Sequence, residues 1–186
     1  SDLSYYPMLP FIMDKKSYKN PIAASSIWVS KDNFQDYYNE RYMYDVTTKQ
    51  DSLNTDKEIE ELRKHIGGFE PFVKTSSNID FIYSHPKKVY IIQNRGVASS
   101  TEGFILTAQQ SDKVKTYGEN TGGYVSYGEW RKLEIPNFPA WISMTQKKMI
   151  FYDDSDFETF GIKPYIELNS DFEKDWINIV QKEIKK

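Results

Sequence analysis

Residues 89–104 read VYIIQNRGVASSTEGF, and this stretch decides the fold more than any other part of the chain. Its first four residues, Val89–Ile92, form an apolar run that is typical of a fully buried strand. Residues 94–96 carry a turn sequence, and the spacing of apolar residues then predicts a helix from about residue 98 to residue 110. The predicted unit is a buried strand that leads through a short turn of small residues into a helix.

Two serines, Ser99 and Ser100, stand where that helix begins. The first N–H groups of a helix have no partner within it, and the positive end of the helix dipole favours an oxyanion. A nucleophilic Ser99 with the Ser100 N–H as oxyanion donor would suit this place. However, Ser99-Ser100-Thr101-Glu102 also has the form of a capping box, which is an ordinary helix start. On local pattern alone the structural role is the commoner of the two.

Helical patterns also occur on both sides of this unit. Residues 32–42 predict a helix and residues 47–54 a loop, and the capping-box form of Thr55–Glu58 predicts a helix that Gly67 and Gly68 end. Near the end of the chain, the second box of residues 170–173 predicts an amphipathic helix. Its expected apolar stripe is Phe172, Trp176, Ile179, Val180 and Ile184.

The remaining segments predict strands and turns, so the sequence indicates a mixed α and β protein. Residues 5–13 are apolar but contain two prolines, which limits them to a short buried helix or strand. The other expected elements are a strand at residues 113–117, a glycine-rich turn at 118–123, and β segments near 124–134 and 140–150.

Composition excludes several classes of function. The chain has 186 residues, 39% of them hydrophobic, so it can bury a core. Its net charge is -3, which gives no basic field for nucleic acid or for an anionic membrane. The absence of cysteine excludes disulfides and thiolate catalysis, and with two histidines the acids form no zinc-type cluster. We therefore expect no cofactor, no nucleic acid and no direct membrane contact.

Three ordered motifs resemble those of the tail-specific, or C-terminal processing, serine peptidases and their tricorn-like branch. The first is Val97–Glu102, which matches a small-Ala-Ser-small-Ser/Thr-Glu signature after a strand. The second is Gly118–Gly123, which matches a Gly-Glu-x-Thr-x-Gly turn. The third is Glu158–Ile166, which matches Glu-x-x-Gly-Ile-x-Pro-Asp-Ile except that Tyr165 replaces the acid. The match covers residues 88–168, and residues 1–87 match loosely.

The resemblance implies an α/β fold, the Clp/crotonase-like spiral of ββα units, with the serine at a helix N-terminus. On this basis residues 1–186 are predicted to be one peptidase catalytic domain that lacks its N-terminal part, with residues 14–54 as a lid or an insertion. The first residues resemble the middle of a protein, so an upstream domain of the same protein is expected as a partner. An extracytoplasmic location, periplasmic or secreted, is favoured by the resemblance alone.

The resemblance also assigns catalytic roles. One branch of the family uses a Ser–Lys dyad, but this chain has Tyr124 and Val125 after the glycine turn, so that lysine is missing. The tricorn-like branch uses a histidine base and a glutamate, and Glu158 takes the place of the glutamate that orients the base. Its alternative role is that of a solvated loop carboxylate.

The general base is not identified within the sequence. His85, just before the strand at residues 89–92, is the better of the two histidines, and His65 is better explained as a favourable cation near a helix C-terminus. We expect the base to lie upstream of Ser1. Gly122 and Gly123 are either donors to the oxyanion or, more commonly, plain hairpin residues.

These residues predict a serine-type peptidase that hydrolyses peptides or proteins through an acyl-enzyme on Ser99. One alternative is a catalytically inactive member of the family that binds peptide tails or sheet edges. Another is a carbohydrate-binding or scaffold domain that shares only the helix cap. In the second alternative Ser99 would be buried away from any cleft.

Overall fold

A computed structural model describes residues 5–43, 46–70, 73–74, 77–152, 155–168 and 173–185. The chain divides into two compact units. Unit 1 contains Ser1–Ala23, Thr75–Ser126 and Ile150–Lys186, and unit 2 contains Ala24–Lys74 and Tyr127–Met149. The predicted lid or insertion at 14–54 does not coincide with either unit, because its first ten residues belong to unit 1. Its role as a lid remains a prediction.

Unit 1 is built around a small parallel sheet with the strand order β10-β7-β6. Strand β6 (Val89–Gln93) pairs in parallel with β7 (Val114–Gly118), and β7 pairs with the two-residue strand β10 (Ile166–Glu167). Helix α4 (Ser100–Ala108) connects β6 to β7 and forms a β-α-β unit with them. Strand, turn and helix therefore occur where the stretch 89–104 predicts them.

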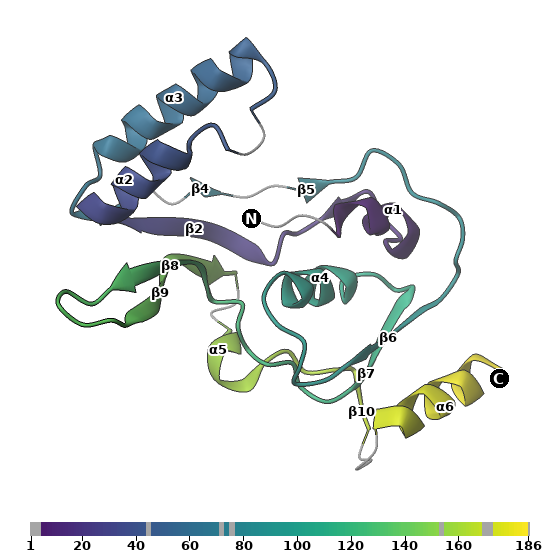
Figure 1. Cartoon of the computed structure of the whole chain (residues 1–186). Coiled ribbons are helices and arrows are strands. Elements are labelled where there is room, and N and C mark those ends of the chain that lie inside the picture. The colour runs from purple at the N-terminus through teal and green to yellow at the C-terminus, as the bar shows by residue number, and fades with distance from the viewer. Residues whose placement is uncertain are drawn as a thin grey trace. The chain divides into compact units, whose positions relative to one another are not determined.

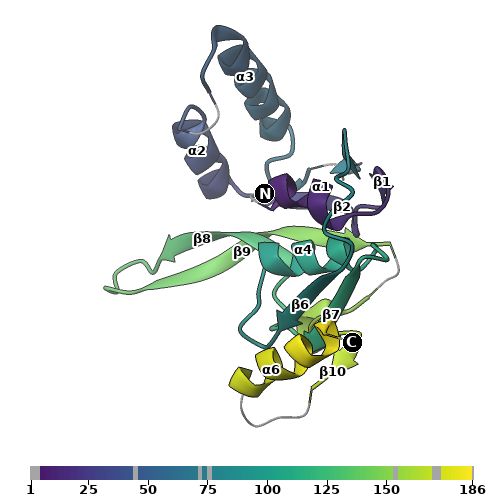
Figure 2. The ribbon, with the colours of Figure 1, turned by 90° about the vertical axis from the view of Figure 1, so that its right-hand side faces the viewer.

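Two helices cover opposite faces of the β6–β7 pair (Figures 1 and 2). On the α4 face, Val89, Ile91 and Val114 pack with Ala108 of α4 and with residues of α1 (Leu9–Ile12). Of the short buried helix or strand expected in residues 5–13, the structure has the helix. On the other face lies α6 (Glu173–Ile184). The same unit contains the 3₁₀ helix η1 (Tyr6–Met8), the short strands β1 (Ser17–Tyr18) and β5 (Ser77–Asn78), and α5 (Phe157–Phe160).

Two predictions about burial in unit 1 need correction. Strand β6 is not fully buried, since Ile92 is 38% exposed. Among the described residues it is an edge strand of the three-stranded sheet, with β7 on its paired side. In α6, Trp176 and Val180 are buried but Ile179 and Ile184 are exposed, because the short sheet is too narrow to cover the whole predicted stripe. Phe172 and residues 170–172 of the predicted box lie outside the described residues.

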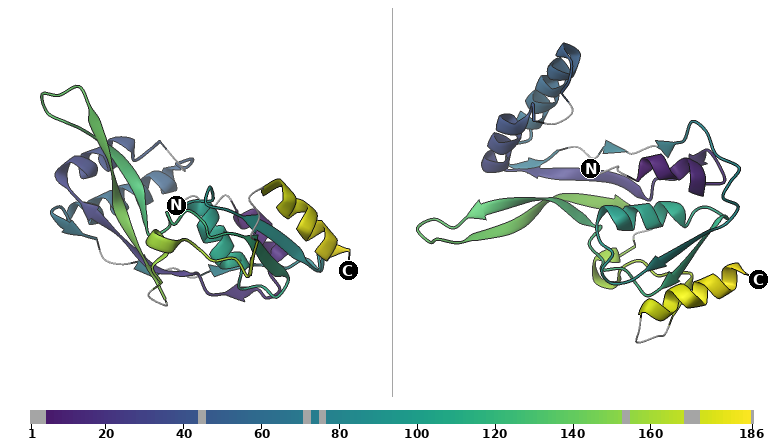
Figure 3. Two further views of the ribbon diagram at one scale, coloured as in Figure 1. Left: turned by 90° about the horizontal axis from the view of Figure 1, so that it is seen from below. Right: turned by 45° about the vertical axis from the view of Figure 1, so that its right-hand side comes forward.

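Unit 2 consists of an antiparallel sheet and two helices. The sheet has the order β3-β2-β9-β8, and β4 also pairs with β2. Its strands are β2 (Ile22–Val29), β3 (Gly68–Phe69), β4 (Val73–Lys74), β8 (Tyr127–Glu134) and β9 (Trp141–Phe151), of which the first two residues of β2 and the last two of β9 belong to unit 1. Strands β8 and β9 form a long two-stranded ribbon, at the residues where β segments are predicted (Figure 3). Val29, Phe34 and Ile59 form the core between β2 and the helices.

The helices of unit 2 are α2 (Lys31–Glu40) and α3 (Lys49–Arg63). The first confirms the predicted helix, and the prediction of a loop at 47–54 is wrong. Thr48 is the N-cap of α3, and Asp51 at the third position closes a capping box with it. An aspartate can close such a box as a glutamate does, so the helix begins before Thr55. The described helices are too short or too polar to cross a membrane.

Candidate active site

The predicted nucleophile lies in a strained turn between β6 and α4. Ser99 is the N-cap of α4 and has φ 54° and ψ −122°. Positive φ is uncommon for residues other than glycine, and such strain in folded proteins clusters at functional sites. Ser99 is also exposed. A sharp strand-to-helix turn that exposes a serine is the geometry of a nucleophile elbow.

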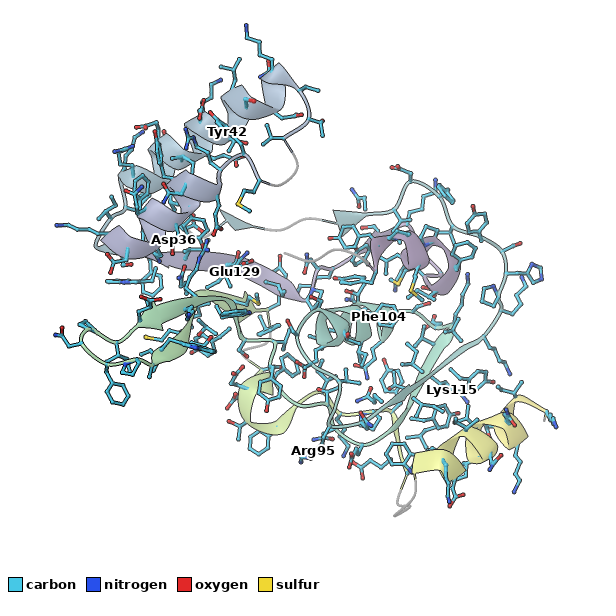
Figure 4. The ribbon with its side chains drawn as sticks, in the orientation of Figure 1. Asp36, Tyr42, Arg95, Phe104, Lys115 and Glu129 are labelled. Atoms are coloured by element: carbon cyan, nitrogen blue, oxygen red, sulfur yellow. The ribbon has the colours of Figure 1, made fainter. Side chains whose placement is uncertain are left out.

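The elbow lies at the edge of the sheet where ligands bind in open parallel sheets. Because β6 and β7 are parallel, the loops that follow Gln93 and Gly118 leave from the same carboxyl edge. Figure 4 shows Arg95 at this edge, whereas Lys115 lies near the amino end of the strand pair. The two motifs that follow these strands in the sequence therefore meet in space.

A buried carboxylate joins the two loops. Glu102 has no solvent exposure, and each of its oxygens accepts two hydrogen bonds. Oε2 accepts from the N–H of Ser99 at 2.8 Å and from that of Tyr124 at 2.8 Å. Oε1 accepts from the Gly123 N–H at 2.7 Å and from the Thr121 hydroxyl at 2.5 Å. Hydrogen bonds to a charged acceptor are the strong ones, so this carboxylate fixes the elbow to the glycine-rich turn.

The glycines of this turn are required by close packing. Gly123 has φ +81°, and a Cβ at this position would lie 2.5 Å from the backbone oxygen of Phe157. The Gly122 N–H donates to the Val97 oxygen at 2.8 Å, and the Gly123 N–H donates to Glu102. Both donors therefore have partners inside unit 1. The turn is not a hairpin either, since β7 and β8 belong to different sheets.

Glu158 belongs to the same neighbourhood. It lies in α5 and is exposed, and its Oε2 accepts from the Ser126 N–H at 3.3 Å. Ser126 follows the turn that Glu102 joins to Ser99. Hydrogen bonds therefore connect the backbone of Ser99, through Glu102, and the side chain of Glu158 to residues 121–126. Ser100 is the first residue of α4, and its N–H therefore has no acceptor within the helix.

The two histidines belong to other segments of the chain. His85 is exposed, and its Nδ1 is 3.1 Å from the Ser84 hydroxyl. It precedes β6 whereas Ser99 follows it, and the five residues of that strand extend over about 16 Å. The structure therefore does not bring His85 to Ser99. His65 follows α3 and belongs to unit 2.

Three buried polar residues of the site were not predicted as functional: Glu102, Thr121 and Gln93. The Gln93 amide nitrogen donates to the backbone oxygens of Ile162 at 2.7 Å and Glu119 at 3.1 Å. The signal for the first two was present, since Glu102 and Thr121 belong to two of the three matching motifs. Among the described residues, His, Asp and Glu form no group of three or more that could hold a metal ion.

Comparison with known proteins identifies the family. Peptidase family S41 matches residues 20–168, and the chain belongs to this family. No curated protein matches the chain in sequence. Among solved structures, mature CPAF in complex with lactacystin matches with a TM-score of 0.60 and 15% identity, over 99% of this chain and 41% of that one. A second structure of mature CPAF gives a TM-score of 0.54 and 16% identity, over 90% and 36%.

These comparisons confirm the family resemblance and the α/β fold class, a partial Clp/crotonase-like catalytic domain. The photosystem II D1 C-terminal processing protease also matches, with a TM-score of 0.37 and 18% identity, over 55% of this chain and 25% of that one. The chain spans about two fifths of the length of the CPAF chains. The chain is therefore a member of a peptidase family.

Proposed function

We propose that the protein is a serine-type peptidase in which Ser99 is the nucleophile. The observation that carries this proposal is the backbone of Ser99, with its positive φ, its exposure and its place at the start of α4. A residue that served only as a helix cap could adopt the ordinary β-region conformation, as Ser30 and Thr48 do at the starts of α2 and α3. The strain at Ser99 therefore supports a role for its hydroxyl.

The reaction would pass through an acyl-enzyme. The Ser99 Oγ attacks the carbonyl carbon of the scissile peptide bond while its proton moves to a general base, and the Ser100 N–H donates to the oxyanion. The C–N bond then breaks, and the base returns the proton to the leaving amine. A water molecule hydrolyses the ester by the same steps. Glu158 would orient and stabilise the base.

We propose that the base is a histidine from outside these 186 residues. We do not assign this role to His85, because the five residues of strand β6 separate it from Ser99. The substrate class would be peptides or proteins, and an upstream part of the same protein would complete the site. We infer an extracytoplasmic location from the family resemblance, which cell fractionation would test.

The experiment is labelling of the full-length protein with a fluorophosphonate, followed by mapping of the modified residue. We expect modification of Ser99, its loss in Ser99→Ala, and labelling about 100-fold slower or more in Glu158→Gln. His85→Gln should label at the wild-type rate. Ser143→Ala, at an exposed serine of β9, is the control for nonspecific reaction.

Two outcomes would contradict the proposal in different ways. A folded protein that binds peptides but is not labelled at Ser99 would be the inactive peptide-binding member of the family. Loss of labelling in His85→Gln, with the fold retained, would make His85 the base and would overturn the assignment of an external histidine.

A further inference from the structure

Thr121 has no solvent exposure, and its hydroxyl makes two hydrogen bonds. The hydroxyl donates to Glu102 Oε1 at 2.5 Å and accepts from the Ile162 N–H at 2.8 Å. The backbone of Thr121 adds a third bond, from its N–H to the Ile162 oxygen at 3.2 Å. One threonine thus binds both the carboxylate under the elbow and the segment that follows α5.

The two partners of Thr121 lead to the backbones of the two predicted catalytic residues. Glu102 accepts the N–H of Ser99, and Ile162 lies four residues after Glu158. Gly161 makes the approach close, because a Cβ there would lie 2.1 Å from the Thr121 oxygen. The side-chain amide of Gln93, the last residue of β6, donates a hydrogen bond to the Ile162 oxygen. The segment after α5 is therefore fixed to the carboxyl edge of the sheet.

We propose that Thr121 is a positioning residue of the peptidase site, whose hydroxyl sets the position of the Glu158 segment relative to the Ser99 elbow. This inference rests on the proposed function, because positioning matters only if both side chains act in one reaction. Displacement of a catalytic group by about 1 Å can lower a rate about 100-fold. A hydroxyl can donate to the carboxylate and accept from the N–H at once, which the methyl group of valine cannot do.

Three variants of the full-length protein separate positioning from stability. Thr121→Val keeps the shape of the side chain and removes both hydroxyl bonds, whereas Thr121→Ser keeps the hydroxyl. Thr107→Val is the matched control. Thr107 is also buried, at 1% exposure, and its hydroxyl donates to the Gly103 oxygen at 2.9 Å within α4. Thr107→Val therefore also removes a buried hydroxyl, but one whose bond does not lead to α5.

For peptide hydrolysis, we expect Thr121→Val to lower kcat about 100-fold with KM unchanged. Thr121→Ser should restore kcat to within about threefold of wild type, and Thr107→Val should stay within the same range. If Thr121→Val and Thr107→Val lower kcat equally at equal loss of stability, the hydroxyl is only structural and the inference fails while the proposed function stands.

Amide hydrogen exchange tests the coupling without activity. Thr121→Val should raise exchange at Ile162 and at Ser126 about tenfold or more, while Thr107→Val leaves both unchanged. Unchanged exchange at these amides in Thr121→Val refutes the coupling. If wild-type Ser99 is not labelled, the proposed function fails, and the exchange data alone decide whether Thr121 connects the two segments.

Discussion

Helices α3 and α4 begin with the same short motif and use it differently. In α3 the box is Thr48 and Asp51, with Thr48 in an ordinary extended conformation at φ −126°. Among the described residues, the Asp51 carboxylate accepts from its neighbours Thr47 and Thr48, within four residues. In α4 the N-cap Ser99 has φ 54°, and Glu102 also binds groups 19 to 22 residues away.

The difference shows which features distinguish a functional site from an ordinary helix cap. A cap satisfies local donors, which requires neither strain nor burial. Around α4 the carboxylate is fully buried, it joins two loops, and the serine that it holds is in a sparsely populated conformation. Strain of this kind persists only where the surroundings enforce it. The following predictions test whether the α4 region is held more tightly than the α3 region.

The largest expected difference concerns two glycines with positive φ. Gly67, after α3, has φ +93° and no atom within 4 Å of a Cβ built there, whereas a Cβ on Gly161 would clash with the Thr121 backbone. Gly161→Ala should lower the free energy of unfolding by about 4 kcal/mol, from conformational strain and overpacking together. Gly67→Ala should cost about 1 kcal/mol, from strain alone. Urea unfolding of both variants measures this, and equal losses would contradict the close packing at Gly161.

The second difference concerns the two boxes themselves. In Glu102→Gln the amide NH₂ would face two of the four donors around this buried carboxylate, so the free energy of unfolding should fall by about 3 kcal/mol. Thr48→Ala removes an exposed cap and should cost about 1 kcal/mol. Thermal unfolding of both variants provides the comparison. A loss in Glu102→Gln no greater than that in Thr48→Ala would mean that Glu102 is also an ordinary cap residue.

Sequence alone predicted the parts of unit 1 but not how they are joined. Val89–Gln93, the turn and α4 follow from local patterns, because apolar periodicity and capping are properties of neighbouring residues. The resemblance to the peptidase family indicated Ser99 and Glu158 as residues of the catalytic site. Nothing local shows that Glu102 turns inward to Thr121 and Gly123, since those bonds close loops of about 20 residues.

The same limit explains the errors. The prediction of a loop at residues 47–54 is wrong because Asp51 closes a capping box with Thr48, a role that glutamate fills in the usual pattern. The apolar stripe predicted to be buried on α6 is wider than the face that the structure buries. The extent of a helix's buried face depends on the sheet that it packs against. That sheet has only three strands, and its size is a tertiary property.

The smallest expected effect is the pH dependence of the α3 cap. Hydrogen bonds from Thr48 hold the pKa of Asp51 below its ordinary value. The largest effect comes from the Thr48 side chain, and the next largest from its backbone N–H. A lowered pKa in the folded state means that the ionised carboxylate stabilises the helix start above the unfolded pKa. This contribution is lost as the pH falls through the folded value. An NMR titration of the Asp51 carboxyl carbon, with the Thr48 amide as reporter, should show the cap opening at acid pH. In Asp51→Asn the acid-induced change at Thr48 should be absent, and its persistence would show that another group opens the helix start.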